Sequence, residues 1–221
     1  MLEEGLLKLG INIDDRIRSL LVKYIEEIEL FNPAYGLVKV RDRQELIVKH
    51  ILDSLAPFDI FNCLLEKAAP EKKSIADAGS GAGLPGIPLA ICMPFAEFTL
   101  IERMARRAGF LRDVQALLGL SNVRIEEAEM ERLKPGQFDL VVFRAFKPLS
   151  PAILKGLFAL LAPGGILAAY KGRRESVEEE MAGVLSAAEK GKGPAPGSWE
   201  MLPLEVPSLE EERHLVLIRP E

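Results

Sequence analysis

The sequence predicts an α/β fold: a mostly parallel, seven-stranded sheet, preceded by a helical cap and completed by an antiparallel C-terminal hairpin. Two observations lead to this prediction. From residue 74 onward, strand-like and helix-like segments alternate, which is typical of a parallel sheet with helices on both faces. After the last predicted helix, two strand-like runs are joined by a polar acidic turn, a pattern that predicts an antiparallel pair.

The N-terminal part of the chain contains helix-like patterns only. Apolar side chains recur there at helical spacing, and we expect Asn12 to begin and Asn32-Pro33 to end the first helix. The predicted helices cover residues 12–31, 43–55 and 58–68. Because they precede the first strand, we expect residues 1–70 to form a cap or flank on a domain of residues 71–221, the two making one compact unit.

The remaining elements follow in alternation. The predicted strands cover residues 74–78, 97–102, 123–126, 138–143, 165–171, 199–206 and 213–218. The predicted helices between them cover residues 85–92, 105–118, 150–161 and 175–189. In open sheets of this kind, ligands bind beyond the carboxyl ends of the strands, where the strand order reverses. Residues that follow the strands are therefore the candidates for a site.

A glycine-rich segment, DAGSGAGLPG, starts at Asp77 near the end of the first strand. Its glycines at Gly79, Gly81 and Gly83 allow sharp backbone turns and leave no Cβ to block a ligand. Glu102 ends the next strand, where a carboxylate can accept hydrogen bonds from both hydroxyls of a ribose. The arrangement predicts a site for a nucleoside-containing cofactor.

Two cofactor classes fit this segment. Residues 81–86 read G-x-G-x-x-G, which is typical of dinucleotide-binding folds. The Asp77 carboxylate, however, would repel a pyrophosphate and attract the ammonium or sulfonium of S-adenosylmethionine. Pro85 also lacks the N–H that the start of a phosphate-binding helix offers. We therefore expect S-adenosylmethionine, with a dinucleotide as the alternative.

The bulk properties limit the class of protein. The chain has 221 residues, a net charge of −5 and no long uninterrupted apolar run, so we expect no membrane span. The N-terminus lacks a basic, apolar targeting segment, and Cys63 and Cys92 are too few for a disulfide framework or a metal site. We expect two buried, reduced thiols, no metal and a cytoplasmic monomer.

The acidic net charge does not favour a nucleic-acid partner, although basic residues form local clusters.

Four segments together resemble the glucose-inhibited division protein B (RsmG) family. They are residues 49–55 (KHILDSL), the loop 79–86 with its GLPG, the arginine-rich helix 103–115, and Arg144-Ala145-Phe146. The resemblance covers nearly the whole chain and implies the class I S-adenosylmethionine-dependent methyltransferase fold. It implies an enzyme that methylates N7 of a guanine in the helix 18 loop of 16S rRNA, with the RNA or the small ribosomal subunit as partner. A small-molecule or protein methyltransferase, or a dinucleotide-dependent oxidoreductase, remains the alternative.

The resemblance also implies site residues. It places cofactor contacts at Gly79 and Leu84, at Ala128 and Glu129 after the third strand, and at Arg144 after the fourth. Together with the residues chosen from the loop itself, the expected cofactor-binding set is Asp77, Gly79, Gly81, Gly83, Leu84, Glu102, Ala128, Glu129 and Arg144.

The chemistry of the implied reaction requires orientation more than proton transfer. Guanine N7 has a lone pair and no proton to lose, so methylation there needs no general base. We expect Arg144 to hold the methionine carboxylate, the guanine edge or a phosphate, and His50 to be structural or to orient RNA or a carboxylate such as Asp53. The target base must leave its stack. The residues expected to bind the RNA backbone are Lys39, Arg41, Arg43, Lys171 and Arg173.

Overall fold

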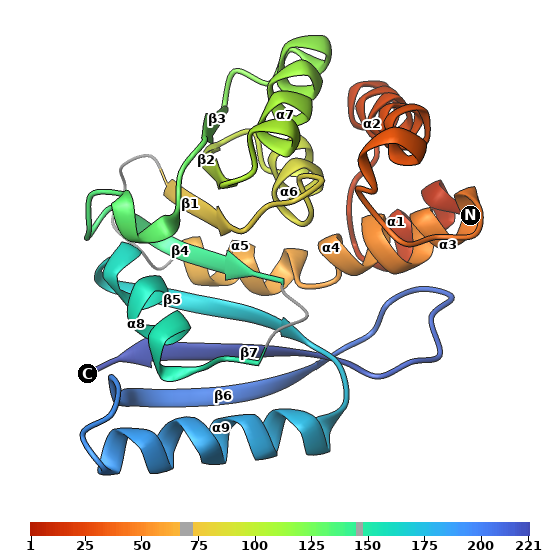
Figure 1. Ribbon diagram of the computed structural model, residues 1–221. Coiled ribbons are helices and arrows are strands. Elements are labelled where there is room, and N and C mark those ends of the chain that lie inside the picture. Colours follow the sequence, from red (N-terminus) through yellow and green to blue (C-terminus); the bar gives the residue numbers. More distant parts are fainter. Residues whose placement is uncertain (67–72, 145–147) are drawn as a thin grey trace.

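The computed structural model describes residues 1–66, 73–144 and 148–221 (Figure 1). The predicted boundary between residues 70 and 71, the last residues of the predicted helix 58–68, and Ala145 and Phe146 lie outside these ranges.

A single seven-stranded sheet organises the chain, in the order β3-β2-β1-β4-β5-β7-β6. The strands are β1 (Lys73–Ala78), β2 (Ala96–Ile101), β3 (Val123–Glu126), β4 (Phe138–Phe143), β5 (Leu161–Lys171), β6 (Pro196–Leu204) and β7 (Arg213–Pro220). Strands β1 to β5 pair in parallel, whereas β7 pairs antiparallel with both β5 and β6. The predicted fold class is confirmed, and the strand order reverses between β1 and β4.

The helices follow the predicted alternation, with two short additions. They are α1 (Leu2–Lys8), α2 (Asp15–Tyr35), α3 (Arg43–Leu46), the π-helical η1 (Ile47–Leu52), α4 (Asp53–Leu55), α5 (Phe58–Glu66), α6 (Gly86–Cys92), α7 (Ala105–Leu118), the 3₁₀ turn η2 (Met130–Arg132), α8 (Pro151–Leu160) and α9 (Arg174–Glu189). Neither α1 nor η2 was predicted. None of the helices in the described ranges has the length and apolar character that a membrane crossing requires.

Two hydrophobic cores cover the two faces of the sheet. Alternate residues of β4 divide between them: Leu140 and Val142 belong to one core, Val141 and Phe143 to the other. The first core also contains buried side chains of α2, η1, α6 and α7, and the second contains those of α8 and α9. The N-terminal helices therefore share a core with the sheet rather than enclosing one of their own.

Helix α2 differs from its prediction at both ends. It begins after Asp14, whose side chain accepts a hydrogen bond from the Ile17 backbone at 2.6 Å, so Asp14 rather than Asn12 caps it. It continues through Pro33 and ends at Gly36, which has a left-handed conformation (φ 59°). The residue pair that was expected to stop the helix instead lies in its last turn.

Two further expectations need correction. Helix α8 ends at Leu160, and β5 begins at Leu161, earlier than predicted, because an irregularity in its pairing with β4 accommodates the intervening residues. Cys92 is buried, but Cys63 is exposed. Helix α5 buries Phe61 and Leu65 on one face. Cys63 lies between them in the sequence and therefore points to the opposite, exposed face of the helix.

Candidate active site

Asp77 organises the glycine-rich loop from the buried end of β1. Its Oδ2 accepts hydrogen bonds from the Ser80 hydroxyl at 2.5 Å and from the Gly86 backbone at 3.0 Å. A Cβ on residue 86 would lie 2.7 Å from this oxygen, so glycine is required there for the carboxylate to approach. Asp77 thus also holds the loop together, a role that was not predicted from the sequence.

The other Asp77 oxygen, Oδ1, is buried without a hydrogen-bond partner among the described residues. Burial raises the pKa of Asp77 to about 6, against the opposing effect of the Ser80 and Gly86 hydrogen bonds and the charge of Arg144. A buried acceptor without a partner is costly, so this oxygen is suited to a cationic or hydrogen-bond-donating group.

The glycines of the loop divide into two kinds. Gly79 (φ 78°) and Gly81 (φ 60°) have left-handed conformations, and an added Cβ would meet open space or ordinary contact distances. Around Gly83, in contrast, a Cβ would lie 2.6 Å from Ile87 and 2.9 Å from Leu111. Gly79 and Gly81 therefore leave the loop open to a ligand, whereas Gly83 allows close packing between the loop and its helices. Leu84 is buried.

Helix α2 holds the same loop from the side of the N-terminal cap. The buried Tyr24 hydroxyl donates a hydrogen bond to the Ala82 carbonyl at 2.8 Å. The helical periodicity of residues 12–31 gives Tyr24 only a place on the apolar face of the helix. Its hydroxyl could not be assigned a partner from sequence, because the two residues are far apart along the chain.

The amino end of α6 does not offer the free N–H groups that bind phosphate. The Gly86 N–H donates to Asp77, and the Ile87 N–H donates to the Gly83 carbonyl at 2.7 Å. The third residue of the helix is Pro88, which has no N–H. This arrangement disfavours the dinucleotide alternative, which places a pyrophosphate at the helix amino terminus.

Glu102 lies where β2 ends and is buried beside the loop. Its Oε2 accepts a hydrogen bond from the Gly81 backbone at 3.0 Å, and its Oε1 accepts one from the Met104 backbone at 2.8 Å. Each carboxylate oxygen keeps a second lone pair. Glu102 thus links the loop to the start of α7 and retains acceptor capacity for two ribose hydroxyls.

The two candidates after β3 lie on the connection to η2. Ala128 is half-buried, and its backbone donates to the Glu126 carbonyl at 3.1 Å. Glu129 is exposed, with its carboxylate 3.9 Å from the Arg132 guanidinium. Since Glu102 and Glu126 are joined by a backbone hydrogen bond between β2 and β3, this connection begins next to Glu102.

Arg144, directly after β4, is the centre of a polar cluster. Its Nη1 donates to Asp53 Oδ2 at 2.9 Å and approaches the Ser54 hydroxyl at 3.4 Å, and its Nη2 lies 3.2 Å from His50 Nδ1. The other Asp53 oxygen accepts a hydrogen bond from Arg213 Nε at 3.0 Å. Arg144 and His50 were singled out from the sequence, whereas Arg213 was missed and Asp53 was given no independent role.

His50 is a neutral partner of Arg144. A guanidinium only donates, so His50 Nδ1 must accept and the proton must sit on Nε2. Burial lowers the pKa of His50 to about 4, and the charge of Arg144 adds to this effect. His50 thus contacts Arg144 rather than the Asp53 carboxylate, and its expected role in orienting RNA stays a prediction.

The residues expected to bind RNA fall into two groups. Lys39 and Arg173 are exposed, Arg41 is 83% exposed beside Glu45, and Arg43 pairs with Glu29 at 2.6 Å. Lys171, in contrast, is not exposed enough to contact an RNA backbone. Its side chain is only 9% exposed and lies 2.6 Å from Glu180. The same Glu180 oxygen accepts from the Leu149 backbone, which identifies Lys171 as part of a structural ion pair.

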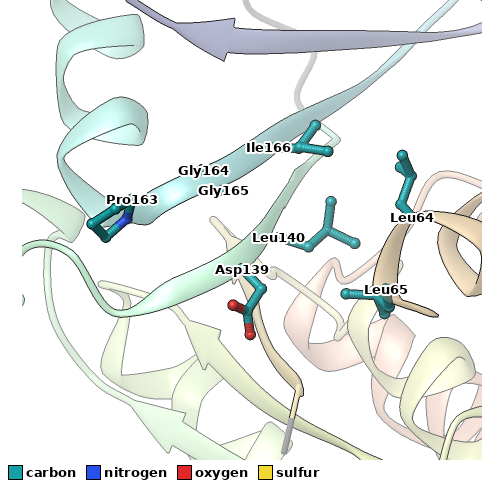
Figure 2. Close-up of a pocket in the computed structure, with 8 residues that line it drawn as sticks. All are labelled: Leu64, Leu65, Asp139, Leu140, Pro163, Gly164, Gly165 and Ile166. Atoms are coloured by element: carbon teal, nitrogen blue, oxygen red, sulfur yellow. The ribbon is translucent and has the colours of Figure 1, made fainter. Parts of the chain in front are cut away.

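A cavity of about 300 Å³ lies at the other end of the sheet (Figure 2). Its lining includes Asp139 and Leu140 near the start of β4, with Ile166 of β5 and Leu64 and Leu65 of α5. Asp139 Oδ2 is already bonded to the Ser74 backbone and hydroxyl, each at 2.8 Å. This cavity is therefore remote from the carboxyl ends of β1, β2 and β4, where the candidate residues gather.

The residues at these carboxyl ends fit S-adenosyl-L-methionine. A buried acceptor without a partner suits a cationic group, an open glycine loop admits the ligand, and Glu102 can bind a ribose. No group of three or more histidine, cysteine, aspartate or glutamate side chains within the described ranges is placed to hold a metal ion.

Comparisons with known proteins agree with this fit. The GidB family model, described as rRNA small subunit methyltransferase G, matches residues 17–192. The ribosomal RNA small subunit methyltransferase G of Treponema pallidum (strain Nichols) is 42% identical over 204 residues, 90% of this chain and 84% of that protein. Its namesake in Stenotrophomonas maltophilia (strain K279a) is 37% identical over 223 residues, 98% of this chain and 92% of that protein.

A solved structure has a similar fold. A SAM-dependent methyltransferase of Aquifex aeolicus gives a TM-score of 0.53 at 20% identity, over 75% of this chain and 92% of that one. From the family match and the close relatives, the chain belongs to the GidB family of rRNA small subunit methyltransferases, enzymes whose methyl donor is S-adenosyl-L-methionine.

Proposed function

We propose that this enzyme transfers a methyl group to N7 of a guanine in the helix 18 loop of 16S rRNA. Membership of the GidB family and relatives named ribosomal RNA small subunit methyltransferase G support the class of substrate. The choice of N7 comes from the resemblance noted in the sequence and from the chemistry of the site.

The observation that carries the proposal is that His50 is neutral and already hydrogen-bonded within the protein. It is the histidine next to Arg144, yet its Nδ1 accepts from Arg144 and its pKa is about 4. An imidazole so engaged is not free to remove a proton from a substrate. Guanine N7 has no proton to remove, so a site built for orientation is sufficient for its methylation.

Three side chains would hold the cofactor in this reaction. Bound S-adenosyl-L-methionine would supply an electrophilic methyl group, and the sulfonium loses its charge as the guanine gains it. Glu102 would accept the ribose hydroxyls. Asp77 would face the cationic part of the methionine moiety, and Arg144 would donate hydrogen bonds to its carboxylate. Six candidates remain: Gly79, Gly81, Gly83 and Leu84 would shape the loop, and Ala128 and Glu129 would lie beside the adenine.

The RNA would approach over the exposed basic residues near the same edge of the sheet. Lys39, Arg41 and Arg43 precede or begin α3, and Arg173 follows the carboxyl end of β5. Such residues bind the phosphate backbone without reading sequence, so the target guanine must be splayed from its loop to reach the methyl group.

A labelling experiment tests the proposal. The protein is incubated with methyl-labelled S-adenosyl-L-methionine and, separately, with deproteinised 16S rRNA and small ribosomal subunits. Transfer to one guanine, mapped by its N7-methyl chemistry to the helix 18 loop, is the expected result. The comparison of the two substrates also shows whether free RNA or the assembled subunit is preferred. Label on another nucleotide, or on no RNA, would contradict the proposal.

The net charge of −5 favours a second candidate, a small-molecule or protein methyltransferase on the same fold. The same assay, run with cell extract, separates the two, since label in small molecules or protein alone would support this candidate.

We propose further that the protein acts as a cytoplasmic monomer in which the N-terminal helices and the sheet form one unit. Light scattering at assay concentrations checks the monomer.

A further inference from the structure

We propose that Asp53 is a positioning residue: anchored by Arg213, its carboxylate holds the Arg144 guanidinium in the orientation that binds the carboxylate of the methionine moiety. The inference rests on the cofactor role proposed above for Arg144 and adds two residues to the machinery. It does not depend on which nucleic acid, protein or small molecule receives the methyl group.

The three charged residues come from distant parts of the chain. Asp53 opens α4, Arg144 follows β4, and Arg213 opens β7. The Asp53 side chain is 7% exposed, with Arg144 Nη1 at 2.9 Å from one oxygen and Arg213 Nε at 3.0 Å from the other. Arg213 is itself fixed by a hydrogen bond to the Glu212 carbonyl at 2.9 Å. The Asp53 carboxylate therefore joins the helical cap, the central strand and the C-terminal hairpin.

The contacts of Arg144 leave part of its guanidinium available. Of its five N–H donors, the contacts to Asp53, Ser54 and His50 engage three, two on Nη1 and one on Nη2. The contacts among the described residues leave the Nε donor and a second Nη2 donor for other acceptors. A guanidinium fixed on one side in this way can meet a carboxylate with the two donors of the other side.

The charge of Arg144 also acts on a second carboxylate, that of Asp77, the buried acid of the glycine loop. If Arg144 turned to pair with Asp77, it would neutralise the carboxylate that is suited to the cationic part of the cofactor. The Asp53 carboxylate prevents this, because it compensates the charge of Arg144 and leaves Asp77 without an ion-pair partner among the described residues.

The test uses two ligands that differ in the methionine moiety. S-adenosylhomocysteine carries the amino-acid carboxylate, and 5′-methylthioadenosine lacks it. We expect Asp53→Asn to weaken S-adenosylhomocysteine binding about tenfold and to change 5′-methylthioadenosine binding by less than about twofold, measured by calorimetry. Arg213→Gln should give the same selectivity with a smaller loss, about threefold, and it replaces Asp53→Asn if that variant does not fold.

Asp139→Asn is the matched control, because Asp139 is a partly buried carboxylate at the opposite end of the sheet. It should bind both ligands as the wild type does. Equal losses for both ligands, no loss for either, or a selective loss in the control would overturn the inference. Failure of the wild-type protein to bind S-adenosylhomocysteine would instead reject the cofactor assignment, so the two failures are distinguishable.

Discussion

Two buried aspartates near the same edge of the sheet have opposite electrostatic surroundings. Asp77, in the glycine loop, is bonded to a hydroxyl and a backbone amide and has one oxygen without a partner among the described residues. Asp53, at the junction of the helical cap and the hairpin, lies between two guanidinium groups. Burial raises the pKa of Asp77 to about 6, whereas the charge of Asp53 is compensated within the protein.

The contrast shows that the number of cationic partners of a buried carboxylate decides whether it can bind a ligand. A carboxylate with two cationic partners is already satisfied, so its function is to hold those partners in place. A carboxylate with neutral partners and an unsatisfied oxygen is still available to a cation. We therefore assign ligand binding to the glycine loop and positioning to the Asp53 junction.

Gly81→Val should have the largest effect on the first region. Valine at φ 60° introduces strain of about 1–2 kcal/mol, and its side chain enters the open space in front of the loop. We expect S-adenosylhomocysteine binding to fall at least 100-fold by calorimetry, with the sheet still folded by circular dichroism.

Gly119→Val separates backbone strain from steric block. Gly119, after α7, has nearly the same conformation (φ 62°) and equally open surroundings. We expect it to lose similar thermal stability and to keep wild-type ligand affinity. If both variants bound the ligand equally well, the loop would not be the cofactor site.

Asp77 predicts a pH dependence of cofactor binding. Because the Asp77 pKa is about 6, lowering the pH from 8 to 5 protonates it and removes the negative charge. We expect S-adenosyl-L-methionine affinity to fall about tenfold over this range in the wild type and to stay level in Asp77→Asn. His50, with a pKa of about 4, stays neutral throughout.

The ligand 5′-methylthioadenosine is the control for this titration, because it has neither the sulfonium nor the ammonium. Its affinity should not change between pH 8 and pH 5. An equal pH dependence for both ligands would show that protonation acts on the adenosine side or on the fold instead of on the cationic contact.

The smallest effects should come from the exposed basic residues. Arg41→Ala or Arg173→Ala should weaken RNA binding by about two- to fivefold and reduce its salt dependence, because each removes one phosphate contact. Arg219→Ala is the control. The Arg219 side chain is 41% exposed and pairs with Glu200, and it lies near the end of the antiparallel β7, away from the site. An equally large loss of RNA affinity in Arg219→Ala would show that the RNA binds another face of the protein.

The sequence was sufficient for the features that depend on local pattern. The alternation of strands and helices, the glycine loop and the acid after β2 are each encoded within a few residues, and the structure contains all of them. What sequence could not provide were contacts between distant segments. The Asp53–Arg213 pair, the Tyr24–Ala82 hydrogen bond and the burial of Lys171 against Glu180 depend on tertiary packing. The extension of α2 past Pro33, in contrast, has a local signal in Gly36, the left-handed residue that ends the helix, which the prediction missed.

A crystal structure with S-adenosylhomocysteine tests the central claim most directly. We predict ribose hydroxyls on Glu102, the ligand amino group within reach of Asp77 Oδ1, directly or through one water, and the ligand carboxylate on Arg144, which is still bonded to Asp53. An adenosine bound elsewhere, for example in the cavity beside Asp139, or an Arg144 paired with Asp77 would contradict it.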